Sequence, residues 1–181
     1  MIMIDKIAHG WQVLRGHYWA ALVFDVAAIL LVFALIHSWQ MRHLLSADSD
    51  ALAPDFQLTS LAGEQVTLSQ LRGQKAVLFF FAPWCGVCNA SIGNLQDLHL
   101  VSHDKNLKVL AIAMDYAGLE DVRQFADKHS LTLPVLLGNA GLIQAWKLRG
   151  YPTYYVVDEQ GRVRQRSLGY ATELGLRWRT S

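Results

Sequence analysis

The distribution of apolar and polar residues changes near residue 53. Residues 18–38 form one long apolar stretch in which Asp25 is the only formally charged residue. Beyond it, apolar residues occur in short runs that turn-forming residues separate. A run of about twenty apolar residues is long enough to cross a bilayer as a helix, whereas short runs are typical of the strands and helices of a folded domain. The pattern predicts a transmembrane anchor, a polar linker over residues 39–53 and a domain over residues 54–181.

The predicted anchor contains one unfavourable residue, Asp25. As a helix, residues 18–36 would span about 28 Å, close to the thickness of a bilayer's hydrocarbon core. An ionised Asp at mid-membrane costs about 2.5 to 3.5 kcal/mol, whereas the Leu, Ile, Val and Phe residues of the stretch favour insertion by about 3 to 7 kcal/mol. The alternative is a signal peptide cleaved at Ala51-Leu52-Ala53. The long apolar core favours an uncleaved anchor.

Basic residues on either side of the anchor predict its orientation. Lys6 and Arg15 precede the anchor, and Arg42 closely follows it. Because positively charged flanks stay in the cytoplasm, residues 1–17 are predicted to be cytoplasmic and the folded domain to lie across the membrane. The lipid bilayer is therefore a predicted partner through residues 18–38. The net charge of +1 and the lack of a clustered basic face give no reason to expect nucleic-acid binding.

Strand and helix patterns alternate through the domain. Predicted strands cover residues 56–58, 65–68, 75–81, 107–114, 134–137, 154–158 and 162–168. Predicted helices cover residues 119–129, 142–146 and 172–178, together with a short turn capped by Ser69 and a long helix that starts at the cysteines. In that long helix Leu95, Leu98 and Val101 are predicted to share one face. The alternation predicts an α/β sandwich with a mixed central sheet flanked by helices.

Cys85 and Cys88 are the only cysteines of the chain, and they come shortly after the apolar strand at residues 75–81. A Cys-x-x-Cys pair between a strand and a helix indicates a thiol-disulfide redox site. Unpaired backbone N–H groups and the positive end of the helix dipole favour a thiolate on the first cysteine. A structural disulfide would close too short a loop to stabilise the fold much, and no second Cys or His pair completes a zinc site. We therefore expect a redox-active Cys85–Cys88 disulfide that requires no metal and no cofactor.

Several motifs resemble the thioredoxin superfamily. Residues 84–88, Trp-Cys-Gly-Val-Cys, and residues 150–153, Gly-Tyr-Pro-Thr, are similar to its active-site motifs. Residues 53–56, Ala-Pro-Asp-Phe, more narrowly resemble the membrane-anchored TlpA/ResA group of periplasmic thiol-disulfide proteins. The ending from Gly169 is similar to the suppressor-of-copper-sensitivity D branch. The resemblance covers about residues 53–178 and implies a thioredoxin-like sandwich on the periplasmic side of a bacterial inner membrane.

The resemblance implies roles for individual residues. Cys85 would be the exposed nucleophile, and Cys88 would be the buried thiol that resolves the mixed disulfide. Pro152 would be a cis-proline that faces the cysteines, and the backbone of Tyr151 would pair with a bound substrate strand. The substrate-binding support would comprise Trp84, Tyr151, Pro152 and Thr153.

Two positions depart from the patterns of these families. Thioredoxins carry a buried acid six residues before the first cysteine, where this chain has Phe79. The TlpA/ResA group often has a basic residue directly after the second cysteine, where this chain has Asn89. A proton acceptor for Cys88 must then be water, the partner protein or another carboxylate. Asp115, at the carboxyl end of a predicted strand, is the candidate carboxylate, and its alternative role is that of an ordinary surface acid.

These features predict a membrane-tethered, periplasmic protein thiol-disulfide oxidoreductase that reduces or isomerises substrate disulfides. Gly86 and Val87 place only backbone dipoles between the cysteines, which favours a reductase or isomerase over a strong oxidant. Its partners would be proteins that carry disulfides or thiols, and a membrane electron donor of the DsbD/ScsB type. The alternatives are a dithiol oxidase that donates disulfides and a non-catalytic docking module for an apocytochrome or a copper-handling protein.

Overall fold

The computed structural model describes residues 19, 21–36, 38–39, 44, 52–102 and 106–180 of the 181-residue chain. Contacts divide the chain into two units, Met1–Met41 and Arg42–Ser181. In the first unit, residues 21–36 are helical and exposed. Among the described residues, no helix has both the length and the apolarity that are needed to cross a membrane. The predicted cytoplasmic segment and much of the predicted linker lie outside the described residues, as do residues 18, 20 and 37 of the predicted anchor.

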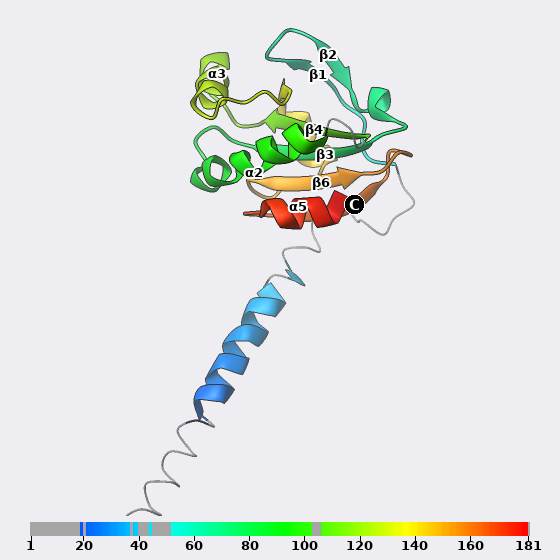
Figure 1. Ribbon diagram of the computed structural model, residues 1–181. Helices are drawn as coiled ribbons and strands as arrows, with labels where there is room; N and C mark the ends of the chain where they lie inside the picture. The colour runs from blue at the N-terminus through cyan, green and yellow to red at the C-terminus, as the bar shows by residue number, and fades with distance from the viewer. Residues whose placement is uncertain are drawn as a thin grey trace, which may run out of the picture. The chain divides into compact units, whose positions relative to one another are not determined.

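The described part of the second unit contains a seven-stranded sheet with the order β2-β1-β5-β4-β3-β6-β7 (Figure 1). Its strands are β1 (Gln57–Ser60), β2 (Gln65–Thr67), β3 (Lys75–Phe81), β4 (Leu107–Ala113), β5 (Val135–Leu137), β6 (Thr153–Val157) and β7 (Val163–Leu168). Strand β4 runs parallel to both β3 and β5, and the remaining neighbours are antiparallel. The sheet is therefore mixed, as the sequence predicts.

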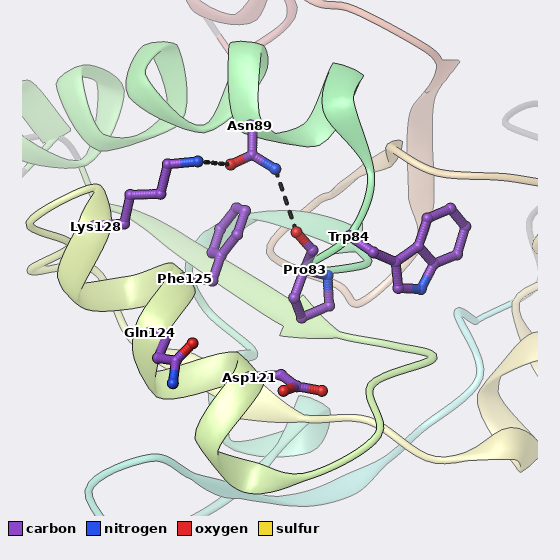
Figure 2. Close-up of a pocket in the computed structure, with 7 residues that line it drawn as sticks. All are labelled: Pro83, Trp84, Asn89, Asp121, Gln124, Phe125 and Lys128. Atoms are coloured by element: carbon purple, nitrogen blue, oxygen red, sulfur yellow. Dashed lines mark hydrogen bonds between the residues drawn. The ribbon is translucent and has the colours of Figure 1, made fainter.

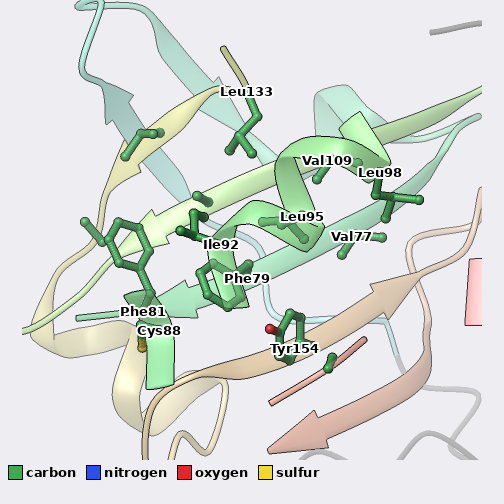
Figure 3. Packing of buried hydrophobic residues seen from close by; sticks show 14 of the residues in the cluster. Val77, Phe79, Phe81, Cys88, Ile92, Leu95, Leu98, Val109, Leu133 and Tyr154 are labelled. Atoms are coloured by element: carbon green, nitrogen blue, oxygen red, sulfur yellow. The ribbon is translucent and has the colours of Figure 1, made fainter. Parts of the chain in front are cut away.

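Helices cover both faces of the sheet. They are η1 (Leu68–Leu71), α2 (Gly86–Ser102), α3 (Leu119–Lys128), α4 (Ala140–Ala145) and α5 (Glu173–Thr180). Side chains of α2, α3 and α5 join one hydrophobic cluster with one face of the sheet. Figure 3 shows the α2 part of this cluster, where Ile92 and Leu95 lie over Phe79 of β3. On the other face, Trp146 at the end of α4 packs against Phe80 and Tyr155, with ring centroids 5.4 and 5.2 Å apart. The predicted sandwich is confirmed.

Strand β3 lies inside the sheet, between β4 and β6, and leads into the cysteine pair. Phe79 and Phe81 point to the face that carries α2 and α3, and the Phe81 ring stacks on Phe125 of α3 at 4.5 Å. Phe80 points to the opposite face. Because both faces of the strand are covered, every residue after Lys75, from Ala76 to Phe81, is apolar and buried.

Two local predictions are wrong. Thr67, not Ser69, caps η1: it forms a capping box in which the Gln70 N–H donates to the Thr67 hydroxyl and the Gln70 side chain accepts from the Thr67 N–H. Val101 is 41% exposed, whereas Leu95 is fully buried. Six residues of helix rotate a side chain by about 120° from its starting direction, which takes Val101 off the buried face.

Candidate active site

Cys85 lies between the end of β3 and the start of α2. The Cys85 N–H donates a hydrogen bond to the Ala82 carbonyl at 3.0 Å, which closes the turn between the two elements. The Cys88 N–H donates to the Cys85 sulfur at 3.3 Å. Cys85 thus occupies the N-cap position, where its sulfur accepts the hydrogen bond that a Ser or Asp oxygen usually accepts. The Cys85 sulfur therefore lies at the positive end of the α2 dipole.

Cys88 lies in the first turn of α2, on the side of the helix that faces the core. The Cys88 side chain is fully buried, and Cys85, which was predicted to be exposed, is also buried, with 8% of its surface exposed, because the Tyr151 backbone lies against its sulfur. Burial raises the pKa of the Cys88 thiol far above its ordinary value, and the neighbouring Cys85 adds to the rise. The sulfurs are not bonded to each other, so the structure shows the dithiol form. Cys88 therefore remains a thiol at neutral pH unless another group stabilises its thiolate.

The loop before β6 contacts Cys85 through the backbone of Tyr151. The Tyr151–Pro152 peptide bond is cis. The Cys85 thiol donates to the Tyr151 carbonyl at 3.5 Å, although 66 positions separate the two residues. The buried Thr153 hydroxyl donates to the Gly150 carbonyl at 2.7 Å and so closes the loop on itself. The structure thus places the Tyr151 backbone beside Cys85, with the predicted residues Pro152 and Thr153 next to it in the chain.

Trp84 is held beside the site by a backbone contact. Its indole N–H donates to the Asp115 carbonyl at 2.8 Å, and its ring meets the Tyr151 ring edge to face at 6.4 Å. Trp84 is 67% exposed, so most of its ring is free to contact a partner. Burial raises the pKa of Tyr151, and the Asp115 charge adds to that rise. Asp115 therefore lies by Trp84 and Tyr151, and in the described part of the chain no hydrogen bond joins its carboxylate to Cys88.

Asn89 connects the active-site turn to α3, a role that the sequence analysis missed. Its amide group donates to the carbonyls of Pro83 at 3.2 Å and of Cys85 at 3.0 Å. Its side-chain oxygen accepts from the Lys128 ammonium group at 2.9 Å and lies 3.0 Å from the His129 ring nitrogen. The position of Asn89 in the first turn of the cysteine helix was the signal available in the sequence. That position does not indicate which residues its side-chain oxygen contacts, since Lys128 and His129 lie about 40 residues further along the chain.

A pocket of about 410 Å³ lies beside this turn (Figure 2). Pro83 and Trp84 line one side, and Asp121, Phe125 and Lys128 of α3 line the other. The Asp121 carboxylate accepts two backbone N–H groups at the start of α3, so the fold already uses its charge. Within the described residues, no group of three or more His, Cys, Asp or Glu side chains is placed to hold a metal ion. The site thus comprises two thiols and an adjoining pocket lined by residues of the active-site turn and of α3.

Comparison with known proteins identifies the class to which this fold and site belong. The chain is 33% identical over 149 residues to the thiol-disulfide oxidoreductase ResA of Oceanobacillus iheyensis, a match that covers 80% of this chain and 76% of that protein. It is 31% identical over 156 residues to the thioredoxin-like protein YneN of Bacillus subtilis, covering 82% and 91%. A crystal structure described as a thiol:disulfide interchange protein DsbE from Chlorobium tepidum has a TM-score of 0.67 and 27% identity, over 74% of this chain and 96% of that one.

The protein is therefore an enzyme of the thioredoxin-like class, a thiol-disulfide oxidoreductase. The family model described as AhpC/TSA matches residues 50–166, and the chain belongs to that family. The similarity to the ResA proteins agrees with the resemblance to the TlpA/ResA group that the sequence motifs suggest.

The difference between the two thiols predicts selective alkylation. Brief treatment of the reduced full-length protein with iodoacetamide at neutral pH should modify Cys85 and leave Cys88 unmodified, because Cys88 is fully buried and its pKa is raised. Peptide mass spectrometry after digestion measures each site separately. Unfolding in denaturant before alkylation is the control, in which both cysteines should react. Equal modification of the two cysteines in the folded protein would contradict the assignment.

Proposed function

We propose that this protein is a membrane-tethered, periplasmic oxidoreductase that reduces or isomerises disulfides of other proteins through Cys85 and Cys88. The observation that carries the proposal is the hydrogen bond from the Cys88 N–H to the Cys85 sulfur. This contact prepares one thiol of the pair for nucleophilic attack, next to the Tyr151–Pro152 loop where a substrate backbone would lie. The relatives named thiol-disulfide oxidoreductase ResA support this chemistry.

The proposed cycle has two exchange steps. The Cys85 thiolate attacks one sulfur of a substrate disulfide, so that a Cys85–substrate bond forms and the second substrate sulfur leaves as a thiolate. Cys88 then attacks the Cys85 sulfur from the same turn of α2, and the substrate leaves with both of its sulfurs reduced. The enzyme is left with a Cys85–Cys88 disulfide, which a membrane electron donor of the DsbD/ScsB type would reduce. Isomerisation occurs when a different cysteine thiolate of the substrate attacks the substrate sulfur of the mixed disulfide, so that a new substrate disulfide forms and Cys85 leaves as a thiolate.

Substitution of each cysteine separates this enzyme from a docking module. Cys85→Ser should abolish disulfide reduction, because the remaining thiol, Cys88, is fully buried. Cys88→Ser should retain the first attack and accumulate a mixed disulfide with a substrate protein, which non-reducing electrophoresis detects. The two variants are matched, because each replaces one cysteine by serine and should keep the fold. If both variants kept full cellular activity, catalysis would be excluded and docking would account for the function.

The reduction potential decides between a reductase and an oxidase. Gly86 and Val87 contribute no charge between the cysteines, so we expect the potential of the full-length protein to lie near that of thioredoxin, about −270 mV, or below it. Equilibration in glutathione buffers followed by trapping of free thiols measures this value. A potential near about −120 mV would show that the protein donates disulfides.

Val87→His is the matched variant for this measurement. Val87 is 46% exposed, so an imidazole at this position can face solvent. A positive charge between the cysteines stabilises the thiolate and hence the reduced form, which makes the protein more oxidising. We expect the variant to have a higher potential than the parent. An unchanged potential would show that groups other than the two intervening residues set its value.

We also propose that residues 18–38 anchor the protein in the bacterial inner membrane with the folded domain in the periplasm. The proposal rests on the apolar stretch and on the placement of Lys6 and Arg15 before it. Protease added to intact spheroplasts should degrade residues 54–181, and the undigested chain should remain in the membrane pellet after an alkaline wash. Protection of the domain in intact spheroplasts would reverse the orientation, and release by the wash would exclude the anchor.

A further inference from the structure

The charged side chains around Cys85 differ in whether the fold already uses their charge. The Asp121 carboxylate accepts two backbone N–H groups at the start of α3, and the Lys128 ammonium group donates to Asn89. Asp115 follows the end of β4 and is exposed. Among the described residues, its carboxylate has no hydrogen bond and no ion pair. Asp115 therefore carries a negative charge that remains available to a bound molecule.

Asp115 lies beside two aromatic side chains. Its carbonyl accepts the Trp84 indole N–H at 2.8 Å, and the Trp84 and Tyr151 rings lie 6.4 Å apart at an interplanar angle of 80°. Asp115 has a φ of 48° or less, at 46°, in the left-handed region that Asn and Asp adopt more readily than most residues. Burial raises the pKa of Tyr151, and the Asp115 charge adds to the rise. We refer to Trp84, Asp115 and Tyr151 as the aromatic–acid cluster.

The aromatic–acid cluster adjoins the reacting sulfur. Trp84 directly precedes Cys85, and the Cys85 thiol donates to the Tyr151 carbonyl at 3.5 Å. Trp84 is 67% exposed, so its ring is accessible to a partner. The Lys128 ammonium group lies on the other side of Pro83 from this ring (Figure 2). A side chain that approaches Trp84 next to Cys85 therefore meets the charge of Asp115 rather than that of Lys128.

The chemistry of the cluster fits a cation. The faces of aromatic rings attract ammonium and guanidinium groups, Trp most strongly, and a nearby carboxylate adds an ion pair. An anionic side chain would instead be repelled by Asp115. Arg149, in the same loop as Tyr151, is exposed, and no ion pair joins it to Asp115 within the part of the chain that the structure describes.

We propose that the aromatic–acid cluster binds a lysine or arginine next to the reactive cysteine of the substrate, so that the protein prefers disulfides in basic segments. Consecutive Cα atoms are about 3.8 Å apart, so a neighbour within two positions of the substrate cysteine lies within about 8 Å of it, and a long basic side chain covers the remaining distance. Asp115 determines specificity and takes no part in the exchange of sulfurs. This inference rests on the proposed function, because it assigns the substrate class of the same site.

Activated peptides measure the preference at the first exchange step. Three peptides, acetyl-Gly-Xaa-Cys-Xaa-Gly-amide with Xaa as Lys, Ala or Glu, carry their cysteine as a mixed disulfide with nitrothiobenzoate. The Cys85 thiolate attacks the peptide sulfur, a Cys85–peptide bond forms, and nitrothiobenzoate leaves as a coloured thiolate. Stopped-flow absorbance gives the second-order rate with reduced full-length protein in a non-ionic detergent. Each rate is divided by the rate of the same peptide with mercaptoethanol, which corrects for its own reactivity.

The parent protein should react fastest with the Lys peptide and slowest with the Glu peptide. Asp115→Asn should lower the ratio of the Lys rate to the Ala rate by about threefold, the effect of one exposed ion pair. Asn also adopts the left-handed conformation, so the variant should keep the fold. In the parent, the same ratio should fall towards the Asp115→Asn value in 1 M KCl, where the Debye length is about 3 Å. This salt measurement requires no variant.

Asp97→Asn is the matched control. Asp97 is an exposed residue of α2, twelve positions after Cys85, so the substitution removes the same charge about 18 Å further along the helix. Screening over about 8 Å at physiological ionic strength should leave the ratio of the Lys rate to the Ala rate equal to that of the parent. An equal loss of preference in Asp97→Asn would overturn the inference, because the net charge of the protein would then account for it.

The outcomes distinguish this inference from the proposed function. Equal corrected rates for the three peptides in the parent would overturn the role of the aromatic–acid cluster alone, as would an unchanged preference in Asp115→Asn. A parent protein that releases no nitrothiobenzoate from any peptide would overturn the proposed function, and the inference with it.

Discussion

The hydrogen bond from the Cys88 N–H to the Cys85 sulfur is the interaction on which the chemistry of this protein depends. It exists because Cys85 is the N-cap of α2, and the first backbone N–H groups of a helix have no partner within the helix. The same helix turn places Cys88 inside the core, where its thiol is shielded from water. One short segment thus produces two different thiols: Cys85 keeps a small exposed area beside the Tyr151–Pro152 loop, whereas Cys88 is fully buried.

The position of that segment depends on β3. The strand is covered on both faces, by the α2, α3 and α5 cluster on one side and by Trp146 on the other. Pairing with β4 and β6 over most of its length prevents the strand from shifting relative to its neighbours. The cysteine turn is therefore attached to a rigid part of the fold, and the cis-proline loop before β6 reaches it because β6 is the neighbouring strand.

The TlpA/ResA group often has a basic residue after the second cysteine. In this protein a hydrogen bond from a lysine of α3 brings a positive charge to that position instead. Asn89 stands where these proteins often have a basic residue, and it has no charge of its own. The Lys128 ammonium group nevertheless reaches its side-chain oxygen from α3. The amide of Asn89 in turn donates to the carbonyl of Cys85, so a positive charge from a distant element acts on the active-site turn. Substitutions in α3 can thus alter the turn without contacting either cysteine.

The elements around the cysteines could be predicted from sequence because they depend on neighbours in the chain. The apolar run of β3, the helix after it and the order of Cys85 and Cys88 all follow from local pattern and from motifs. The partners of those residues could not be predicted in this way, since Tyr154 meets Phe79 only through the pairing of β6 with β3. The sequence by itself determined the class of chemistry and the two sulfurs that perform it. Only the tertiary structure decided which groups surround those sulfurs, because strand order and helix packing bring together residues that lie far apart in the chain.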